Sequence, residues 1–203
     1  FHMESQTQMT ALSLNDKDLS GSSFHYPSGP HKIQGFIVRP KAEGEYPAII
    51  YNRGGFKSFG SISPEYIERN LVPIAKHGYV VAASQYRGVG ESEGNDEFAG
   101  DDVEDVIALH KLVSEMPDVD ATRIGMVGWS RGAVMAFRAM VRLPSLKAVV
   151  VGGAPTDLAT QAKEREDMQK VFVEAFGSTP EKYEQGLRER SVLHWVDTLP
   201  KVP

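Results

Sequence analysis

Gly128-Trp129-Ser130-Arg131-Gly132 places a serine between two glycines and gives the strongest indication of the fold. An apolar run from Ile124 to Val127 precedes it, and a run of helical character from Ala133 to Val141 follows. On a sharp strand-to-helix turn the serine hydroxyl is lifted above the sheet, where the helix N-terminus stabilises negative charge. The flanking glycines leave room for so tight a turn. The stretch therefore predicts a nucleophile elbow; a helix-capping serine in a glycine-rich turn is the alternative.

The composition is that of an ordinary globular chain. Of the 203 residues, 41% are hydrophobic and 24% charged, and the net charge is -5. Because no basic cluster could track phosphates, we expect a small organic substrate and neither nucleic acid nor a membrane as partner. The absence of cysteine excludes disulfides, thiolate metal sites and cysteine nucleophiles. Both a cytoplasmic location and a periplasmic one, with an export signal removed, stay open.

The N-terminal residues differ from the rest. Phe1-His2-Met3 has the character of a cleavage or cloning scar, and the following residues are polar. We expect residues 1–21 to be loosely ordered and residues 22–203 to form one domain.

From residue 22 onward, apolar runs and helical patterns alternate, which indicates an α/β fold. The first two strands, separated by Pro27-Ser28-Gly29-Pro30, are expected to form an antiparallel hairpin. Six strands are expected, at residues 22–26, 32–39, 47–51, 79–83, 124–127 and 146–151. Helices are expected at residues 64–76, 102–115, 133–141 and 158–176, with helical pieces in 180–197. Ser63 and Pro64 are typical of a helix start.

Three motifs in order carry a family resemblance: the segment Tyr86-Arg-Gly-Val-Gly-Glu-Ser-Glu-Gly94, then Asp120-Ala-Thr-Arg123-Ile-Gly125, then the elbow. With them the chain resembles the α/β-hydrolase fold, a mostly parallel sheet with helices on both faces. More narrowly, it is similar to the catalytic domain of the prolyl-oligopeptidase (S9) and dienelactone-hydrolase-like group over roughly residues 22–203. Asn52-Arg53-Gly54-Gly55 adds to the resemblance. Because no β-propeller precedes the domain, the resemblance implies a stand-alone esterase or small peptidase.

The resemblance also implies roles for individual residues. Ser130 would attack an ester or amide carbonyl and form an acyl-enzyme that water hydrolyses. The oxyanion hole would consist of the Arg131 backbone N–H and a second one from Arg53 or Gly54. The Arg53 side chain either contacts substrate or braces its loop. Trp129 either lines the mouth of the substrate pocket or packs against the neighbouring helix.

In the family the acid and the histidine base come later, after the seventh and eighth strands. Only six strands are expected here, and Leu199-Pro-Lys-Val-Pro203 has the character of a lead-in to the seventh. We therefore expect the last two strands, with the acid and base, to lie beyond residue 203. Asp157 and His194 follow Ser130 in the right order, but we interpret Asp157 as a helix-start residue and His194 as a packing residue.

Without a seventh strand, Lys147 to Val151 would form an open, apolar, β-branched edge. We expect this edge to bind a second polypeptide that carries the rest of the domain, or a second copy of the chain.

No metal or cofactor is expected. The acidic residues between Arg87 and Asp105 lack EF-hand spacing, and we interpret them as the solvated start of a helix. The histidines match no zinc-hydrolase pattern, and no nucleotide-binding glycine motif is present.

The leading hypothesis is a serine hydrolase that cleaves carboxylic ester or short acyl-peptide bonds through Ser130. The rival hypothesis is a non-catalytic or inactive hydrolase-fold protein that acts in binding or assembly. The sequence does not name the acyl group or the leaving group.

Overall fold

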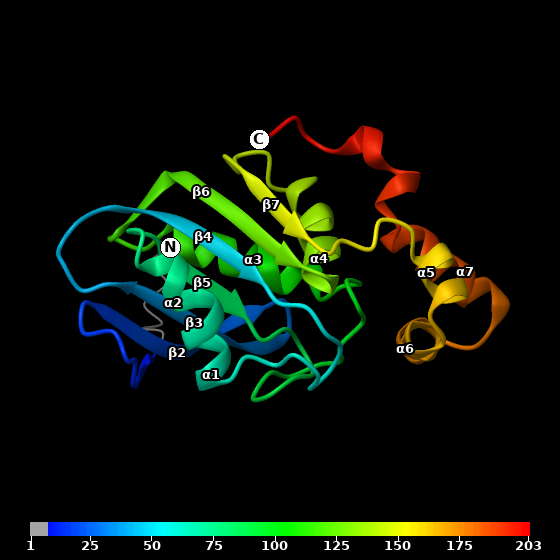
Figure 1. Ribbon diagram of the computed structural model, residues 1–203, viewed down its shortest axis with the longest axis horizontal. Helices are drawn as coiled ribbons and strands as arrows, with labels where there is room; N and C mark the ends of the chain where they lie inside the picture. Colours follow the sequence, from blue (N-terminus) through cyan, green and yellow to red (C-terminus); the bar gives the residue numbers. More distant parts are fainter. Residues whose placement is uncertain (1–7) are drawn as a thin grey trace.

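A seven-stranded sheet runs through residues 8–203, the part of the chain that the computed structural model describes (Figure 1). The strands lie side by side in the order β1-β2-β3-β5-β4-β6-β7. Their bounds are β1 Thr10–Leu12, β2 Leu19–Ser28, β3 His31–Pro40, β4 Tyr46–Asn52, β5 Val80–Ser84, β6 Val119–Trp129 and β7 Val149–Gly152. The six expected strands are therefore confirmed, and β1 is additional.

The sheet is mixed, with an antiparallel half and a parallel half. β1, β2, β3 and β5 pair antiparallel, and β2 and β3 form the expected hairpin. β5, β4, β6 and β7 pair parallel. The chain leaves β4 to one side to form β5 and then returns to the other side to form β6. Open α/β sheets bind ligands at such a reversal, outside the carboxyl ends of the strands, which here are those of β4 and β6.

Helices cover both faces of the sheet, as expected. α3 (Val103–Ser114) and α4 (Arg131–Met140) pack on one face, over a core that includes Ile50, Ala82 and Met126. The residues next to these along the strands point to the opposite face, because side chains alternate along a strand. There they meet the helical stretch of residues 64–75 in a second, smaller core.

The helical stretch of residues 64–75 is not one regular helix. α1 (Pro64–Tyr66) begins at Ser63, whose hydroxyl accepts a hydrogen bond from the Tyr66 N–H as expected. A π-helical turn, Ile67–Leu71, and α2 (Val72–Ala75) follow. Pro73 explains the wide turn, because proline cannot donate to the carbonyl four residues back and its ring pushes that carbonyl away.

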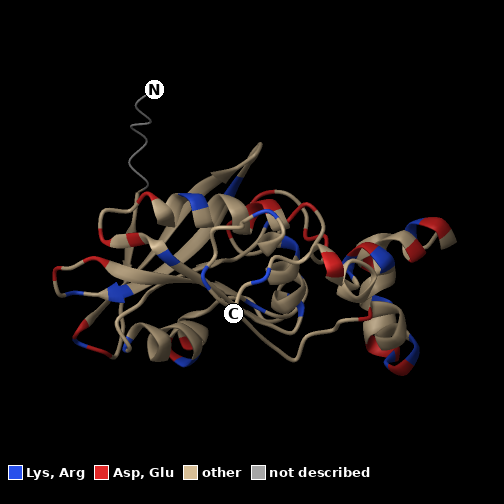
Figure 2. Cartoon of the chain, turned by 90° about the horizontal axis from the view of Figure 1, so that it is seen from above, with Lys and Arg blue, Asp and Glu red and all other residues tan. Residues whose placement is uncertain are grey.

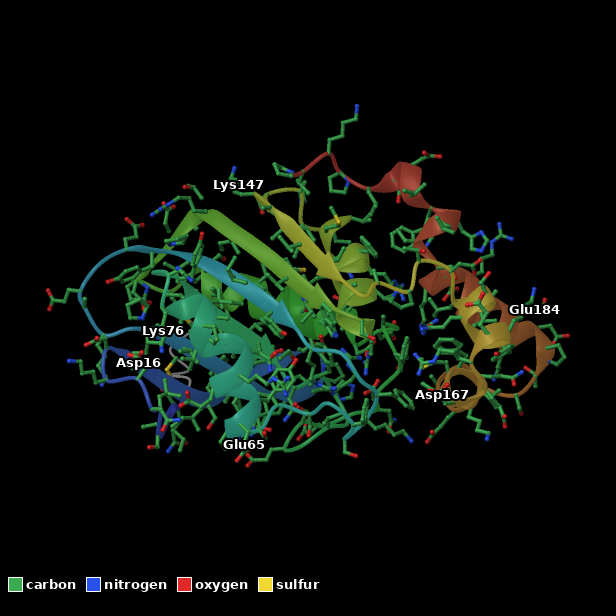
Figure 3. The ribbon with its side chains drawn as sticks, in the orientation of Figure 1. Asp16, Glu65, Lys76, Lys147, Asp167 and Glu184 are labelled. Atoms are coloured by element: carbon green, nitrogen blue, oxygen red, sulfur yellow. The ribbon has the colours of Figure 1, made fainter. Side chains whose placement is uncertain are left out.

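The prediction of a loosely ordered N-terminal segment is wrong for residues 8–21. β1 pairs with β2 from Thr10 to Leu12, and the Leu14 side chain packs on Gly21. Lys76 Nζ lies 3.1 Å from an Asp16 carboxylate oxygen, and the two side chains meet beside α2 (Figure 3). The polar composition of the segment and the shortness of β1 left these contacts unpredicted. Residues 1–7, including Phe1-His2-Met3, lie outside the described part of the chain.

A group of helices lies past the carboxyl ends of the parallel strands, at one end of the molecule (Figure 1). It comprises α5 (Leu158–Glu164), α6 (Glu166–Phe176), α7 (Pro180–Arg190) and the two 3-10 turns Val192–His194 and Val196–Thr198. The single helix expected at residues 158–176 breaks at Arg165, whose backbone is extended. Charges of both signs are interspersed over α5 to α7 (Figure 2).

Aromatic side chains anchor this helical group to the sheet domain. Phe172 of α6 is fully buried and lies edge-on to Phe98, with ring centroids 5.2 Å apart. Phe176, one turn further on, stacks on Phe172 at 5.5 Å. Arg190 of α7 lies over the Phe176 ring and donates to the Phe98 carbonyl at 2.8 Å. The loop that contains Phe98 is therefore fixed from the helical side.

β7 is the last strand of the sheet, as expected for residues 147–151. Its Val149 N–H donates to the Pro203 carbonyl on the outer side, and Val150 is 62% exposed. Association through this edge stays a prediction. None of the helices in residues 8–203 has the length and hydrophobicity needed to cross a bilayer.

Replacing Phe172 with alanine should lower the free energy of unfolding by about 3–5 kcal/mol, because a fully buried ring and its aromatic contacts are lost. Neighbouring Val173 is 40% exposed, so Val173→Ala should cost less than about 1 kcal/mol. Urea denaturation checks both values. Equal losses for the two variants would contradict the anchoring role of Phe172.

Candidate active site

Ser130 occupies the turn between β6 and α4, as the motif predicts. Its backbone has φ 53° and ψ -121°, a left-handed conformation that costs a serine about 1–3 kcal/mol. Two hydrogen bonds hold it there: its N–H donates to the Gly152 carbonyl at 2.8 Å, and its carbonyl accepts from the Ala133 N–H at 2.9 Å. The Ser130 hydroxyl makes no hydrogen bond with any residue in 8–203.

The glycines of the motif are needed for close backbone contacts. A Cβ on Gly132 would lie 2.0 Å from the Asn52 carbonyl oxygen, and one on Gly128 would lie 2.3 Å from the Gly132 carbonyl oxygen. Real Cβ atoms do not approach that closely. A side chain at Gly132 would push α4 away from the end of β4, and one at Gly128 would push α4 away from β6.

The turn after β4 lies directly beside the elbow. A Cβ on Gly54 would be 3.2 Å from Ser130 Cβ and 3.0 Å from the Trp129 carbonyl oxygen. The N–H groups of Arg53, Gly54 and Arg131 have no acceptor within residues 8–203. The turn after β4 therefore lies against Ser130 Cβ, and both this turn and Arg131 carry N–H groups that are free within residues 8–203. The oxyanion hole built from them stays a prediction.

The Arg53 side chain braces its own turn. It is fully buried and donates to the carbonyls of Gln85, Gly54 and Lys57 at 3.0 to 3.3 Å. Its guanidinium also lies over the Tyr86 ring, 4.8 Å from the centroid, while the Tyr86 hydroxyl donates to the Arg53 carbonyl. Because its donors are engaged in these contacts, the Arg53 side chain fits the expected role of bracing its loop better than that of contacting substrate.

Three acidic residues in the loop after β5 and the first turn of α3 are buried, and their interpretation as a solvated helix start is wrong. The carboxylates of Asp96, Asp102 and Asp105 are at most 1% exposed. Asp105 pairs with Arg87 at 2.8 Å, whereas Asp96 and Asp102 both pair with Arg131. Burial raises the pKa of the Asp102 carboxyl. Burial disfavours the charge of Arg131, but Asp102 and Asp96 outweigh it and raise the pKa of its guanidinium.

Trp129 is 60% exposed and lies beside a cavity of about 620 Å³. The cavity is on the face of the sheet that α1 covers, and its wall combines aromatic, amide and charged groups: Tyr51, Ser63, Glu65, Tyr66, Arg69, Asn70 and Trp129. Figure 3 shows Glu65 on α1 at this face. The structure thus places Trp129 at a cavity wall rather than against a helix; substrate binding by it stays a prediction.

Asp157 and His194 do not form a triad with Ser130. Asp157 caps α5, accepting hydrogen bonds from the N–H groups of Ala159 and Thr160 and from the Thr160 hydroxyl. These bonds, led by that of the hydroxyl, hold the pKa of Asp157 below its usual value. His194 is exposed in a 3-10 turn, and no hydrogen bond joins its side chain to Asp157 or Ser130. The interpretation of Asp157 as a helix-start residue is confirmed, whereas the exposure of His194 does not fit the packing role we gave it.

The order of the parallel strands, the strained serine and the close glycines together define an α/β-hydrolase domain. A family model gives the narrower assignment: the model for X-Pro dipeptidyl-peptidase (S15 family) matches residues 29–185. The chain belongs to this family, and the resemblance inferred from the sequence is confirmed at the level of hydrolase-fold peptidases and esterases.

Relatives and solved structures agree with this placement. The chain is 31% identical over 175 residues to the uncharacterized peptidase YtmA of Bacillus subtilis, covering 86% of this chain and 66% of YtmA. It therefore spans just under two thirds of that relative's length. Acylaminoacyl peptidase of Pyrococcus horikoshii superposes with a TM-score of 0.74 at 20% identity, over 92% of this chain and 31% of that chain. Acetyl xylan esterase 1 of Thermoanaerobacterium sp. JW/SL YS485 superposes with a TM-score of 0.62 at 19% identity, over 96% of this chain and 67% of that chain. These structures share the fold.

Gly132→Ala should destabilise the protein although it lies in a helix. Helix propensity alone would favour alanine by about 1 kcal/mol, but the new Cβ would collide with the Asn52 carbonyl oxygen. We expect a net loss of about 1–3 kcal/mol in the free energy of unfolding, measured by urea denaturation.

Gly44→Ala is the control for this variant, because Gly44 is exposed and its nearest neighbour is the edge of the Tyr46 ring. It should change stability by less than about 0.5 kcal/mol. A stabilised Gly132→Ala variant would show that the elbow is not packed as described.

Proposed function

We propose that the chain is a serine hydrolase domain that cleaves carboxylic ester or short acyl-peptide bonds, with Ser130 as the nucleophile. The observation that carries the proposal is the left-handed backbone of Ser130 at the head of α4, with the Gly54 turn packed against its Cβ. A protein holds a serine in so strained a conformation when the surrounding contacts require it, and such strain gathers at reactive sites. Membership of a peptidase family favours the same chemistry and an acyl-peptide substrate.

In the proposed reaction, Ser130 Oγ attacks the substrate carbonyl carbon while a general base takes the hydroxyl proton. The carbonyl oxygen becomes an oxyanion, which the N–H groups of Arg131 and of Arg53 or Gly54 stabilise. When the tetrahedral intermediate collapses, the bond to the leaving alcohol or amine breaks and that group takes up a proton. Water then attacks the acyl-enzyme by the same route, releasing the acid and restoring Ser130.

The general base in this reaction is inferred from the family resemblance, in which a histidine takes the serine proton. Within residues 8–203 no histidine is hydrogen-bonded to Ser130. Nucleophile, base and orienting acid act as a unit, so Ser130 without a base would lose several orders of magnitude in rate. The cavity beside Trp129 would take up one side of the substrate.

A fluorophosphonate probe tests the proposal. It should attach covalently to Ser130, giving one adduct per chain by intact mass and a modified peptide that contains Ser130. Ser130→Ala should show no adduct at that peptide. A rate at least about 100-fold above background labelling of other serines is expected for a serine activated by its site.

The same experiment separates the proposal from its rival, a non-catalytic binding or assembly protein. The lack of a hydrogen bond to the Ser130 hydroxyl within residues 8–203 is the observation that favours the rival. If the folded wild-type protein shows no adduct on Ser130, the result would favour the rival hypothesis.

A further inference from the structure

The proposed chemistry makes no use of Asp96, although its carboxylate lies between the two loops beside Ser130. Asp96 belongs to the glycine-rich loop after β5, and its side chain is 1% exposed. One carboxylate oxygen accepts from the Lys57 N–H at 2.8 Å, and the other accepts from the Phe98 N–H at 3.0 Å. Lys57 follows Gly54 and Gly55 in the turn after β4, so Asp96 is tied to the proposed oxyanion loop.

The guanidinium of Arg131 binds both Asp96 oxygens. Its Nη1 donates to Oδ2 at 2.7 Å, and its Nη2 lies 2.7 Å from Oδ1. The same Nη1 donates to the Gly55 carbonyl at 3.1 Å. A bidentate, charge-assisted pair of this kind fixes direction as well as distance. Because Arg131 is the first residue of α4, its side chain connects the elbow to the turn after β4.

The turn from Gly54 to Lys57 depends on such outside contacts. Gly55 and Lys57 have φ of 83° and 53°, and the turn has no strand partner. Arg53 braces the turn from within through the Gly54 and Lys57 carbonyls. Asp96 and Arg131 hold it from the side of the elbow, one through the Lys57 N–H and the other through the Gly55 carbonyl.

We propose that Asp96 is a positioning residue that sets the spacing between the two backbone donors of the oxyanion hole. It clamps Arg131, which supplies one donor through its backbone, to the turn that supplies the other. The inference rests on the proposed function, since the hole has a role only if an oxyanion forms beside Ser130. Asp102 also pairs with Arg131, but its oxygen accepts from the Ala99 N–H and does not reach the turn.

Asp96→Asn tests the clamp with little change in size. In either orientation the amide nitrogen must face one nitrogen of the Arg131 guanidinium, together with the N–H of Lys57 or of Phe98, so the bidentate pair is lost. Misplaced oxyanion donors act on the transition state and not on bound substrate. With 4-nitrophenyl acetate as substrate, kcat should fall by about 10- to 100-fold while KM stays within about twofold. Fluorophosphonate labelling of Ser130 should slow by the same factor.

Two further variants separate positioning from folding. Asp101→Asn alters an exposed carboxylate five residues along the same loop and should leave kcat, KM and labelling unchanged. Arg131→Lys keeps the backbone donor and the charge but loses the bidentate fork, and should slow kcat as Asp96→Asn does. If Asp96 acts through Arg131, the double variant should be no slower than the slower single variant. Rates are taken per folded molecule, with the folded fraction measured by thermal unfolding.

The positioning role would be overturned if the wild type is labelled and Asp96→Asn has a labelling rate and a kcat within twofold of the wild-type values. So would a loss that appears in KM or only in proportion to the unfolded fraction. An unlabelled wild type would instead overturn the proposed function, and the inference would fall with it.

Discussion

The close contact between Gly132 and the Asn52 carbonyl shapes the whole site. The first turn of α4 lies so close to the end of β4 that no Cβ fits at Gly132, and Gly128 is excluded from a side chain in the same way. This closeness leaves Ser130 in a left-handed turn above the sheet. It also places the head of α4, where the Arg131 N–H is free within residues 8–203, against the backbone of Asn52 and Arg53, at which the turn after β4 begins. Backbone packing thus brings the elbow and the turn after β4 together, and the Asp96 clamp proposed above would set the finer spacing between their N–H groups.

Next to Ser130 the protein buries charged side chains where apolar ones would be usual. The guanidiniums of Arg53 and Arg131 lie 4.8 and 5.0 Å from the centre of the Tyr86 ring, and Asp96 and Asp102 balance them. Removing charges from water costs several kcal/mol for each ion, and only good geometry with further hydrogen bonds offsets that cost. These buried ion pairs are therefore weak evidence for a gain in stability. They fix the orientation of the Arg131 side chain, since a guanidinium forms two parallel hydrogen bonds to a carboxylate in only one orientation.

The parts of the fold predictable from the sequence are those set by local patterns. The elbow around Ser130, the hairpin of β2 and β3 and the cap at Ser63 each follow from residues close together in the chain. The partners of Arg131 could not be predicted, because Asp96 and Asp102 are 35 and 29 residues away and acidic residues near a helix start usually face solvent. The clue in retrospect is the arginine inside the elbow itself: at the head of a buried helix its charge needs a partner.

β1 and the π turn were missed for other reasons. β1 has only three residues and no clear alternation, so its pairing with β2 is visible only once β2 is placed. The π turn arises from Pro73, which the helical pattern around it concealed. The first is a tertiary effect, whereas the second is a local one that the apolar pattern outweighed in the prediction.

Backbone strain links the site to the helical group at the end of the molecule. Of the non-glycine residues with positive φ in residues 8–203, all lie in the elbow or in the loops after β4 and β5: Lys57, Tyr86, Phe98, Ala99 and Ser130. Each costs energy that the surrounding contacts must offset. For Phe98 those contacts come from Phe172 and Arg190 of the helical group and from the Asp96 carboxylate. The helices past the strand ends therefore support the same loop that ties the elbow to the turn after β4. If Asp96 holds the elbow to the turn after β4 as we propose, a change in the packing of these helices would reach Ser130 through Phe98 and Asp96 without touching substrate.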